Sequence, residues 1–339
     1  MRRALITGIT GQDGTYLADF LLRKGYKIYG TYRRTSTPNF WRLDCLGITD
    51  KVALVPFDLL DQTSIIQALQ IAKPNEFYNL AAQSYVGASF EQAVSTGEIT
   101  GLGLTRVLDS IRVVDPQIRF YQASSSEMFG NSKDSPQTLK TPFRPTSPYG
   151  VAKLYAHEVT RTYREAYGMF ACAGILSNHE SPLRSLEFVT RKITYTMSAI
   201  KLGLTDHITL GNIHARRDWG YAKDYVEGMW LMLQRDKPKD YILATGQRHS
   251  VEEFLRVASD ALGLDYHACL RIDDNLFRPR DIDSLVGDPS EAEKDLGWNP
   301  RKTTFNELVQ IMVESDLRLL KTEKWINLEH IRLLSQLTE

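Results

Sequence analysis

Cysteine is scarce in this sequence, and no charge of either sign predominates. The 339 residues include three cysteines, Cys45, Cys172 and Cys269, which are too far apart for a CxxC pair or a metal-ligand set. An odd and sparse set of this kind argues against a disulfide framework and is typical of a reducing compartment. Lysine plus arginine equals aspartate plus glutamate at 41 each, so bulk charge does not indicate a nucleic-acid or membrane-surface partner.

Long apolar runs and metal-binding patterns are also missing. No stretch approaches the length of a membrane span, and the apolar run after Met1-Arg2-Arg3 ends at Thr7-Gly8, too early for a signal peptide. The seven histidines form no HExxH or similar ligand set, so no metal is expected. We therefore predict a cytoplasmic globular protein without a metal, a membrane segment or a nucleic-acid partner.

Strand and helix patterns alternate along the first half of the chain. Short apolar runs predict strands at residues 4–7, 27–32, 52–58, 76–81, 118–123 and 171–176. Helical periodicity separates them at residues 16–25, 62–72, 96–112 and 149–167. This order predicts an α/β fold, a Rossmann-type doubly wound parallel sheet with right-handed crossovers.

The alternation loosens after residue 176. We predict loops at residues 178–184 and 276–279. We predict helices at residues 188–203, 251–262 and 305–320, and a short strand at residues 208–211. We therefore expect a cofactor-binding domain at residues 1–176, joined by residues 217–246. A smaller α/β substrate-binding domain would consist of residues 177–216 and 247–320, followed by a charged C-terminal tail at 321–339 without an assigned role.

A glycine-rich turn, Gly8-x-x-Gly11-x-x-Gly14, joins the first predicted strand to the first predicted helix. Without a Cβ atom the backbone can approach a pyrophosphate, and the helix N-terminus supplies free N–H groups. A turn without a ligand is the ordinary alternative, but the strand-turn-helix placement favours a dinucleotide site. The expected cofactor contacts in this turn are Gly8, Thr10, Gly11, Gln12, Asp13 and Gly14.

Arg33 and Arg34 follow the second predicted strand, where NAD-specific sites carry a carboxylate for the ribose 2′-hydroxyl. Arginine instead accommodates a 2′-phosphate, so we predict NADP as the cofactor; a solvated basic loop is the alternative. Asp58 and Leu59, after the third strand, could hold the adenine edge. The small residues after the fourth strand would let the backbone pass close to a flat ligand, and the contacts expected there are Leu80, Ala81, Ala82, Gln83 and Ser84.

Tyr149 and Lys153 are four residues apart and therefore lie on one face of a predicted helix. An ammonium beside a phenol favours the phenolate, which would make Tyr149 a usable base near neutral pH. Ser125 and Glu127 follow the fifth predicted strand, at the sheet edge where open α/β sheets bind ligands. A surface Tyr–Lys pair and a carboxylate in the first turn of a helix are the ordinary alternatives. If Glu127 faces the pocket, it implies a proton transfer beyond those of a plain hydride-transfer enzyme.

Further polar residues lie in the second half of the chain. A site role for His179, after the sixth predicted strand, is a hypothesis, and a satisfied loop histidine is the alternative. Lys192, Arg217 and Arg278 are basic residues of the kind that a diphosphate needs, although most lone arginines are solvated.

Together these motifs resemble the GDP-mannose 4,6-dehydratase family of the extended short-chain dehydrogenase/reductase superfamily, from residue 4 to about residue 320. The stretches that carry the resemblance are GITGQDG (8–14), YNLAAQS (78–84), YQASSSEMFG (121–130), SPYGVAKLY (147–155), NHESP (178–182), RDWG (217–220) and FRP (277–279). The first four occur in weaker form in related sugar-nucleotide enzymes. The NHESP and RDWG stretches are more specific to the GDP-mannose group.

The resemblance implies conversion of GDP-D-mannose to GDP-4-keto-6-deoxy-D-mannose through bound NADP. Tyr149, helped by Lys153, would take the 4-hydroxyl proton while hydride leaves C4 for the cofactor, and Ser125 would hydrogen-bond the 4-oxygen. Glu127 would remove the C5 proton and protonate the departing C6 hydroxyl before the hydride returns to C6. The cofactor would end as it began.

The resemblance also implies further contacts. NADP would be contacted by Tyr149, Lys153, His179 and Arg184. The GDP-sugar would be contacted by Ser84, Ser125, Glu127, Asn178, Lys192, Gly211, Arg217 and Arg278. The family uses the loop at residues 33–36 at a subunit contact, which implies a homodimer or homotetramer.

Three positions depart from the family pattern. Ser125 stands where threonine is usual, and Ser177 and Ser185 stand where phenylalanine and glycine are expected. Because these residues flank the expected sugar pocket, a GDP-manno-heptose is an alternative substrate. A reductase or epimerase of a 4-keto sugar nucleotide is a second alternative, against which Glu127 argues. A catalytically silent NADP-binding protein is a third, against which the complete catalytic set argues.

Overall fold

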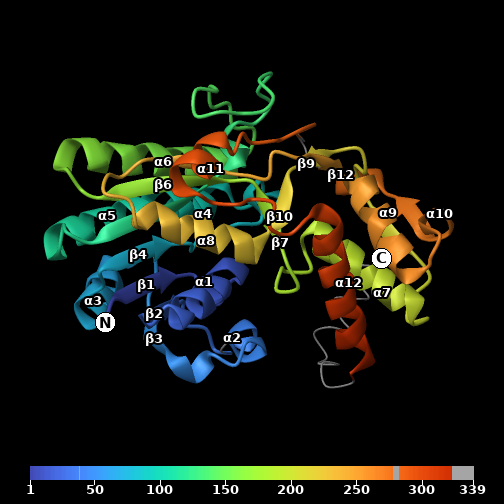
Figure 1. The fold of residues 1–339 in the computed structure, drawn as a ribbon, viewed down its shortest axis with the longest axis horizontal. Coiled ribbons are helices and arrows are strands. Elements are labelled where there is room, and N and C mark those ends of the chain that lie inside the picture. The colour runs from blue at the N-terminus through green and yellow to red at the C-terminus, as the bar shows by residue number, and fades with distance from the viewer. Residues whose placement is uncertain (38, 278–281, 323–339) are drawn as a thin grey trace.

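The computed structural model describes residues 1–37, 39–277 and 282–322. Its centre is a seven-stranded parallel sheet with the order β11-β6-β5-β4-β1-β2-β3 (Figure 1). The strands are β1 Arg3–Thr7, β2 Lys27–Tyr32, β3 Val52–Pro56, β4 Glu76–Asn79, β5 Arg119–Ser125, β6 Ala171–Leu176 and β11 Tyr241–Leu243. The predicted Rossmann-type, doubly wound sheet is thus confirmed. The seventh strand, β11, lies outside the predicted set because three apolar residues carry little periodicity.

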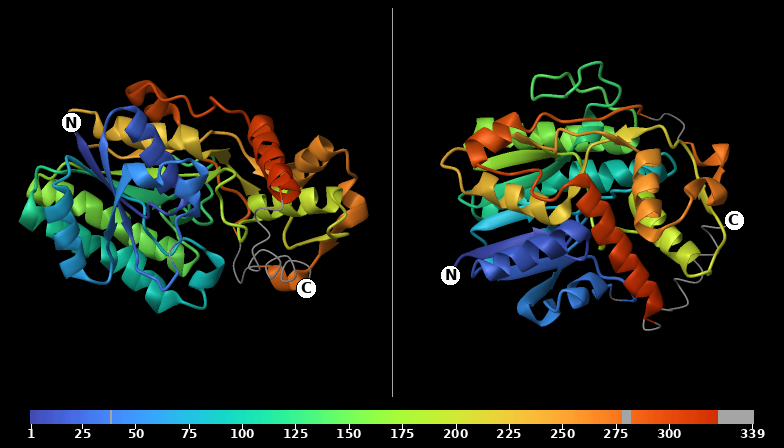
Figure 2. Two further views of the ribbon diagram at one scale, coloured as in Figure 1. Left: turned by 90° about the horizontal axis from the view of Figure 1, so that it is seen from below. Right: turned by 45° about the vertical axis from the view of Figure 1, so that its right-hand side comes forward.

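Helices cover both faces of this sheet. The long ones are α1 Gln12–Arg23 and α8 Ala222–Leu233 on one face and α3 Gln62–Ala72, α5 Gly103–Val114 and α6 Pro148–Tyr167 on the other. Figure 2, left, shows the sheet edge-on between these two layers. The short helices α2 Trp41–Cys45, α4 Ala93–Thr96 and α11 Ser290–Leu296 complete this part of the molecule. In the described ranges, no helix combines the length and the apolar character that a membrane crossing requires.

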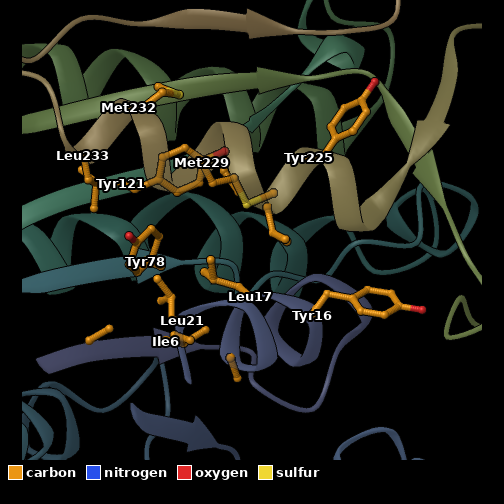
Figure 3. Packing of buried hydrophobic residues seen from close by; sticks show 14 of the residues in the cluster. Ile6, Tyr16, Leu17, Leu21, Tyr78, Tyr121, Tyr225, Met229, Met232 and Leu233 are labelled. Carbon is orange, nitrogen blue, oxygen red and sulfur yellow. The ribbon is translucent and has the colours of Figure 1, made fainter. Parts of the chain in front are cut away.

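Adjacent apolar residues on the strands point to opposite faces and build two cores. Ile6, Tyr78 and Tyr121 pack with α1 and α8, whereas Leu5, Phe77 and Phe120 pack with α3, α5 and α6. Figure 3 shows the first of these cores, in which Met229 of α8 lies on the side of Leu17 of α1. Burial on both faces explains why these strands are continuous apolar runs rather than alternating ones.

The smaller region lies beside the carboxyl ends of the sheet strands (Figure 2, right). Its helices are α7 Val189–Lys201, α9 Val251–Leu262, α10 Tyr266–Cys269 and α12 Phe305–Lys321. These helices share a core that includes Met197, Phe254 and Met312. The parallel pair of β8 Ile208–Leu210 and β13 Leu270–Ile272 completes this region.

Two short strand pairs connect the sheet to the smaller region. In one, β7 Asn178–Glu180 runs parallel to β10 Trp219–Tyr221; in the other, β9 Arg216–Arg217 is antiparallel to β12 His249–Ser250. The prediction of a loop at residues 178–184 is therefore wrong for its first three residues, which form strand β7. Its residues are polar because they enter the site, and their pairing partner lies about forty residues further along the chain.

The predicted helix at residues 96–112 is three helical segments in the structure. Helix α4 continues into a π-helical segment, Gly97–Leu102, and then into α5. The other predicted helices agree with the structure to within a few residues, and the one at 62–72 has the same limits as α3. Helix α1 begins four residues before the predicted start, because its first turn carries the polar residues of the glycine-rich turn rather than apolar ones.

Candidate active site

A cavity of about 860 Å³ opens where the carboxyl ends of the central strands face the smaller region. Its walls come from the segments that follow β1, β4, β5 and β6, from the start of α7, and from residues 210–212 and 275–277. Parallel strands bring their carboxyl ends to one edge, so residues far apart in the sequence meet there. The cavity has the size of a small-molecule or cofactor site.

Most of the predicted site residues line this one cavity. They are Gly8, Gly11, Gln12, Asp13, Gly14, Leu80, Ala82, Ser84, Ser125, Glu127, Tyr149, Lys153, Asn178, His179, Arg184, Lys192, Gly211 and Arg217. Arg278 lies outside the described residues. The structure therefore brings together residues from both predicted domains in a single site.

The other predicted contacts do not belong to the cavity wall. Thr10, Ala81 and Gln83 are sequence neighbours of residues that do line it, and Arg33 is exposed. The Asp58 carboxylate accepts the backbone N–H of Leu60 at 2.9 Å, while Leu59 is buried in the core. Both residues therefore have local structural roles, and their contact with the adenine stays a prediction.

The glycine-rich turn is shaped as a close cradle. Gly8 adopts a positive φ of 68°, and a Cβ atom there would lie 3.0 Å from the backbone nitrogen of Ala81. A Cβ atom on Gly14 would lie 2.3 Å from the carbonyl oxygen of Gly8, which leaves no space for any side chain. At Gly8 and Gly14 the turn therefore presents only backbone, and the N-terminus of α1 lines the cavity. This arrangement fits the pyrophosphate of a nicotinamide dinucleotide.

Buried hydrogen bonds tie this turn to the NHESP segment. Gln12 donates to the carbonyl oxygen of His179 at 3.0 Å and accepts from the Ser181 hydroxyl at 2.6 Å. His179 Nε2 lies 2.7 Å from an Asp13 oxygen, and His179 Nδ1 lies 2.8 Å from the carbonyl oxygen of Ser177. Burial disfavours both charges, but their attraction outweighs it, so the pKa of His179 is raised and the pKa of Asp13 is lowered. His179 is thus an ion-paired residue of the cavity wall.

Tyr149 lies in the first turn of α6, and local chemistry sets that start. Ser147 caps the helix by accepting the N–H of Gly150 at 3.1 Å, and Pro148 occupies the first helical position. The Tyr149 side chain is 8% exposed and shares a hydrogen bond with Ser125. Burial raises the pKa of the phenol; the Ser125 hydroxyl lowers it, and the Glu127 charge raises it further.

The pKa of the Tyr149 phenol is raised, with burial as the largest cause, although Lys153 follows it by one helical turn. The Nζ atom of Lys153 lies 5.8 Å from the centre of the Tyr149 ring and donates to the carbonyl oxygen of Ala123 at 2.7 Å. Burial lowers the pKa of Lys153 itself to about 8. Desolvation is the largest cause of both pKa shifts, and helical spacing alone does not reveal how strongly a side chain is buried.

Glu127 is buried in the same wall, 8% exposed, directly after β5. It lies in a single 3₁₀ turn, Ser126–Met128, where its backbone N–H donates to the Ser125 hydroxyl at 3.2 Å. Because the Glu127 charge acts on the pKa of Tyr149, the two side chains share one electrostatic environment. A carboxyl, a hydroxyl and a phenol thus converge on one cavity, which is the set that two separate proton transfers require.

Three cations line the part of the cavity formed by the smaller region. Arg184 pairs with Glu180 at 3.1 Å and lies 3.5 Å above the ring of Phe188. Arg217 is 7% exposed and donates to the carbonyl oxygen of Ile282 at 2.7 Å. Burial lowers the pKa of Lys192, and the nearby charge of Asp273 partly offsets this shift. Cations held in this way suit a diphosphate group.

Several residues of the site carry no clear signal in the sequence. Arg42 donates to the carbonyl oxygens of Leu183, at 2.7 Å, and Thr10, at 3.1 Å, and so connects the glycine-rich turn to the segment that follows β7, beside the cavity. A lone arginine in a five-residue helix has no pattern by which to detect this role. Tyr85 and Phe188, which lie edge to face at 5.8 Å, also line the cavity. In the described part of the chain, no group of three histidine, cysteine, aspartate or glutamate side chains is arranged to hold a metal.

The chain is similar to known proteins over nearly its whole length. The family model for GDP-mannose 4,6 dehydratase matches residues 5–312. GDP-mannose 4,6 dehydratase 2 of Arabidopsis thaliana is 50% identical over 331 residues, covering 95% of this chain and 88% of that protein. The Homo sapiens GDP-mannose 4,6 dehydratase is 44% identical over 344 residues, covering 94% and 92%. Among solved structures, a Bacillus anthracis dTDP-glucose 4,6-dehydratase in complex with NAD has the same fold, with a TM-score of 0.82 at 19% identity over 96% of this chain and 98% of that one.

Proposed function

Since the chain belongs to the GDP-mannose 4,6-dehydratase family, we propose that it converts GDP-D-mannose to GDP-4-keto-6-deoxy-D-mannose with loss of water. The observation that carries the proposal is Glu127, a carboxyl in the same cavity wall as Tyr149, Ser125 and Lys153. Oxidation of an alcohol needs a base at the hydroxyl but no second acid or base. Dehydration across C5 and C6 needs one.

The proposed roles follow from the chemistry of each side chain. Tyr149 accepts the proton of the 4-hydroxyl, and Ser125, hydrogen-bonded to Tyr149, donates to the 4-oxygen. Lys153, fixed by the carbonyl oxygen of Ala123, supplies a positive charge to the same corner of the cavity. Glu127 removes the acidified C5 proton and gives it to the departing C6 hydroxyl, which leaves as water. When hydride returns to C6, C5 takes up one proton, which balances the proton that Tyr149 accepted from the 4-hydroxyl, so both side chains end in their starting states.

The cofactor in the proposal is NADP, held by the glycine cradle at residues 8–14 and the segment at residues 80–84. When bound, a nicotinamide supplies the hydride acceptor for C4 and the donor for C6. Two observations support the phosphorylated form: β2 lies directly beside β1 in the sheet, and the residues after Tyr32 are Arg33, Arg34, Thr35 and Ser36, without a carboxylate.

Mass spectrometry of the substrate tests the reaction directly. Purified protein incubated with GDP-mannose, without added reduced cofactor, is expected to produce a species lighter by one water. If GDP-mannose is unchanged but GDP-manno-heptose loses water, the mechanism is supported and the substrate is the heptose. No change with either, together with NADPH-dependent reduction of a 4-keto sugar nucleotide, would contradict the proposal and favour a reductase.

Cofactor preference is tested by binding. NADP⁺ is expected to bind at least about 10-fold more tightly than NAD⁺, because charge-assisted hydrogen bonds to a phosphate are strong. Replacing Arg33 and Arg34 together by alanine should remove most of this difference by weakening NADP⁺ binding while NAD⁺ binding stays within about twofold. Isothermal titration calorimetry measures both constants. Equal affinity of the unaltered protein for the two cofactors would contradict the assignment.

We further propose a homodimer or homotetramer in the cytoplasm. The basic loop at residues 33–36 is exposed, and so are the apolar side chains Val94, Leu102 and Val151 on one layer of helices. Exposed apolar groups of this kind support a contact between subunits. The three free cysteines, Cys45, Cys172 and Cys269, are compatible with a reducing compartment.

A further inference from the structure

A row of buried polar side chains crosses the central strands at their carboxyl ends. The sheet register pairs Thr7 of β1 with Asn79 of β4, and Asn79 with Gln122 of β5. These side chains are 0%, 4% and 1% exposed. Buried amides are costly unless their donors and acceptors are paired, and none of the three side chains has a role in the reaction proposed above.

The hydrogen bonds of this row have only one consistent direction. The carbonyl oxygen of Ala123 can only accept, so the Gln122 amide presents Nε2 to it and Oε1 to Asn79. The Thr7 hydroxyl oxygen accepts the backbone N–H groups of Leu80, at 3.0 Å, and Ala81, at 3.1 Å, and its own proton can reach the carbonyl oxygen of Tyr78, at 3.5 Å, as well as Asn79. It donates to Asn79 Oδ1 at 2.8 Å, Asn79 Nδ2 donates to Gln122 Oε1 at 2.8 Å, and Gln122 Nε2 donates to the carbonyl oxygen of Ala123 at 3.1 Å. Ala123 therefore orients the Gln122 amide, and Gln122 orients the Asn79 amide.

Both ends of the row reach the active-site cavity. At one end, Thr7 holds the segment at Leu80 and Ala81, which packs against Gly8 of the glycine cradle. At the other end, Ala123 accepts from Gln122 and also from Lys153, whose Nζ atom is 2.7 Å away. A continuous set of hydrogen bonds therefore connects the cofactor cradle to the catalytic lysine.

We propose that Asn79 and Gln122 are positioning residues for the dehydratase reaction, acting by fixing Lys153 relative to the cofactor cradle. The inference rests on the function proposed above. A lysine side chain has many rotamers, so its ammonium is placed only if its acceptor is itself fixed. Gln122 fixes that acceptor, and Asn79 joins Gln122 to the cradle. An apolar pair of similar size would fill the same space without this orientation.

Gln122→Met is the first test, because methionine has a similar length but neither donates nor accepts strongly. In the purified holoenzyme, kcat for water loss from GDP-mannose is expected to fall at least about 10-fold while KM changes less than about threefold. Thr160→Val is the matched control. The Thr160 hydroxyl of α6 is fully buried and donates to the carbonyl oxygen of Ala156 at 2.8 Å, and turnover by its variant should stay within about twofold of that of the unaltered protein.

Gln122→Glu separates positioning from packing by its pH profile. The new carboxyl group can donate to Ala123 only when protonated, while its other oxygen accepts from Asn79. Activity is therefore expected to approach that of the unaltered protein at low pH and to fall toward that of Gln122→Met as the pH rises and the group ionises. Identical pH profiles for the two Gln122 variants, or a Gln122→Met variant with unchanged kcat, would overturn the proposal.

A readout without substrate distinguishes failure of this inference from failure of the proposed function. If the unaltered protein and Thr160→Val remove no water from either GDP-sugar, the function is wrong. In that case the pKa of Lys153, about 8 in the unaltered protein, tests the hydrogen-bonded row. Mass spectrometry of reductive methylation at a series of pH values measures this pKa. In Gln122→Met the loss of an N–H dipole beside the ammonium should raise this pKa by about half a unit or more. An unchanged value would overturn the network.

Discussion

Replacing Glu127 by glutamine is expected to slow water loss from GDP-mannose by about 10³-fold or more. The amide has nearly the same shape but cannot accept the C5 proton or return one to the C6 hydroxyl. Removal of hydrogen from C4 does not involve this group, so transfer of a deuterium label from C4 to the bound cofactor, here called label exchange, should persist. Mass spectrometry of the cofactor released from the enzyme after incubation with C4-deuterated substrate, combined with a product assay, measures both steps.

Glu158→Gln provides the control for this experiment. Glu158 is a carboxylate of α6 that pairs with Arg161 on the surface, so the same chemical change there should leave turnover within about twofold. Water loss by the Glu127→Gln variant at close to the rate of the unaltered protein would show that another group transfers the C5 proton. If the variant shows neither label exchange nor dehydration, Glu127 instead supports substrate binding or the first step.

Replacing Tyr149 by phenylalanine is expected to abolish both steps, with kcat reduced by about 10³-fold or more. The ring remains buried, so the change removes only the phenol oxygen and its hydrogen bond with Ser125. Because proton removal from the 4-hydroxyl accompanies hydride loss from C4, label exchange should disappear together with water loss. This result is the opposite of that expected for Glu127→Gln, so the two variants assign the two proton transfers independently.

Tyr155→Phe is the matched control on the same helix. The Tyr155 hydroxyl lies 3.1 Å from the Thr105 hydroxyl on the protein surface, away from the cavity wall, and its removal should change turnover by less than about twofold. Label exchange that survives in Tyr149→Phe would contradict the assignment of Tyr149 as the base. An equal loss of turnover in Tyr149→Phe and Tyr155→Phe would indicate that the substitutions perturb helix α6 and do not act on the proton transfer.

Much of the fold follows from local patterns in the sequence. Helix α3 was predictable to the residue because its periodicity is regular and Asp61 caps it, accepting the backbone N–H groups of Thr63 and Ser64. The doubly wound sheet followed from the order of its elements, since parallel strands need crossover helices. Short elements such as β7 and β11 were not predictable because they exist only through partners distant in the sequence.

The sequence by itself determined the types and spacing of the chemical groups at the candidate site. Glycines at positions 8, 11 and 14 specify a backbone cradle, and a spacing of four places Tyr149 and Lys153 on one helix face, because both are properties of local geometry. Only the tertiary structure decided what surrounds these groups. The ion pair of His179 with Asp13 spans 166 positions, and the Thr7–Asn79–Gln122 row spans three strands. The raised pKa of Tyr149 has the same origin, because desolvation depends on every neighbour that excludes water and not on the nearest charge along the helix.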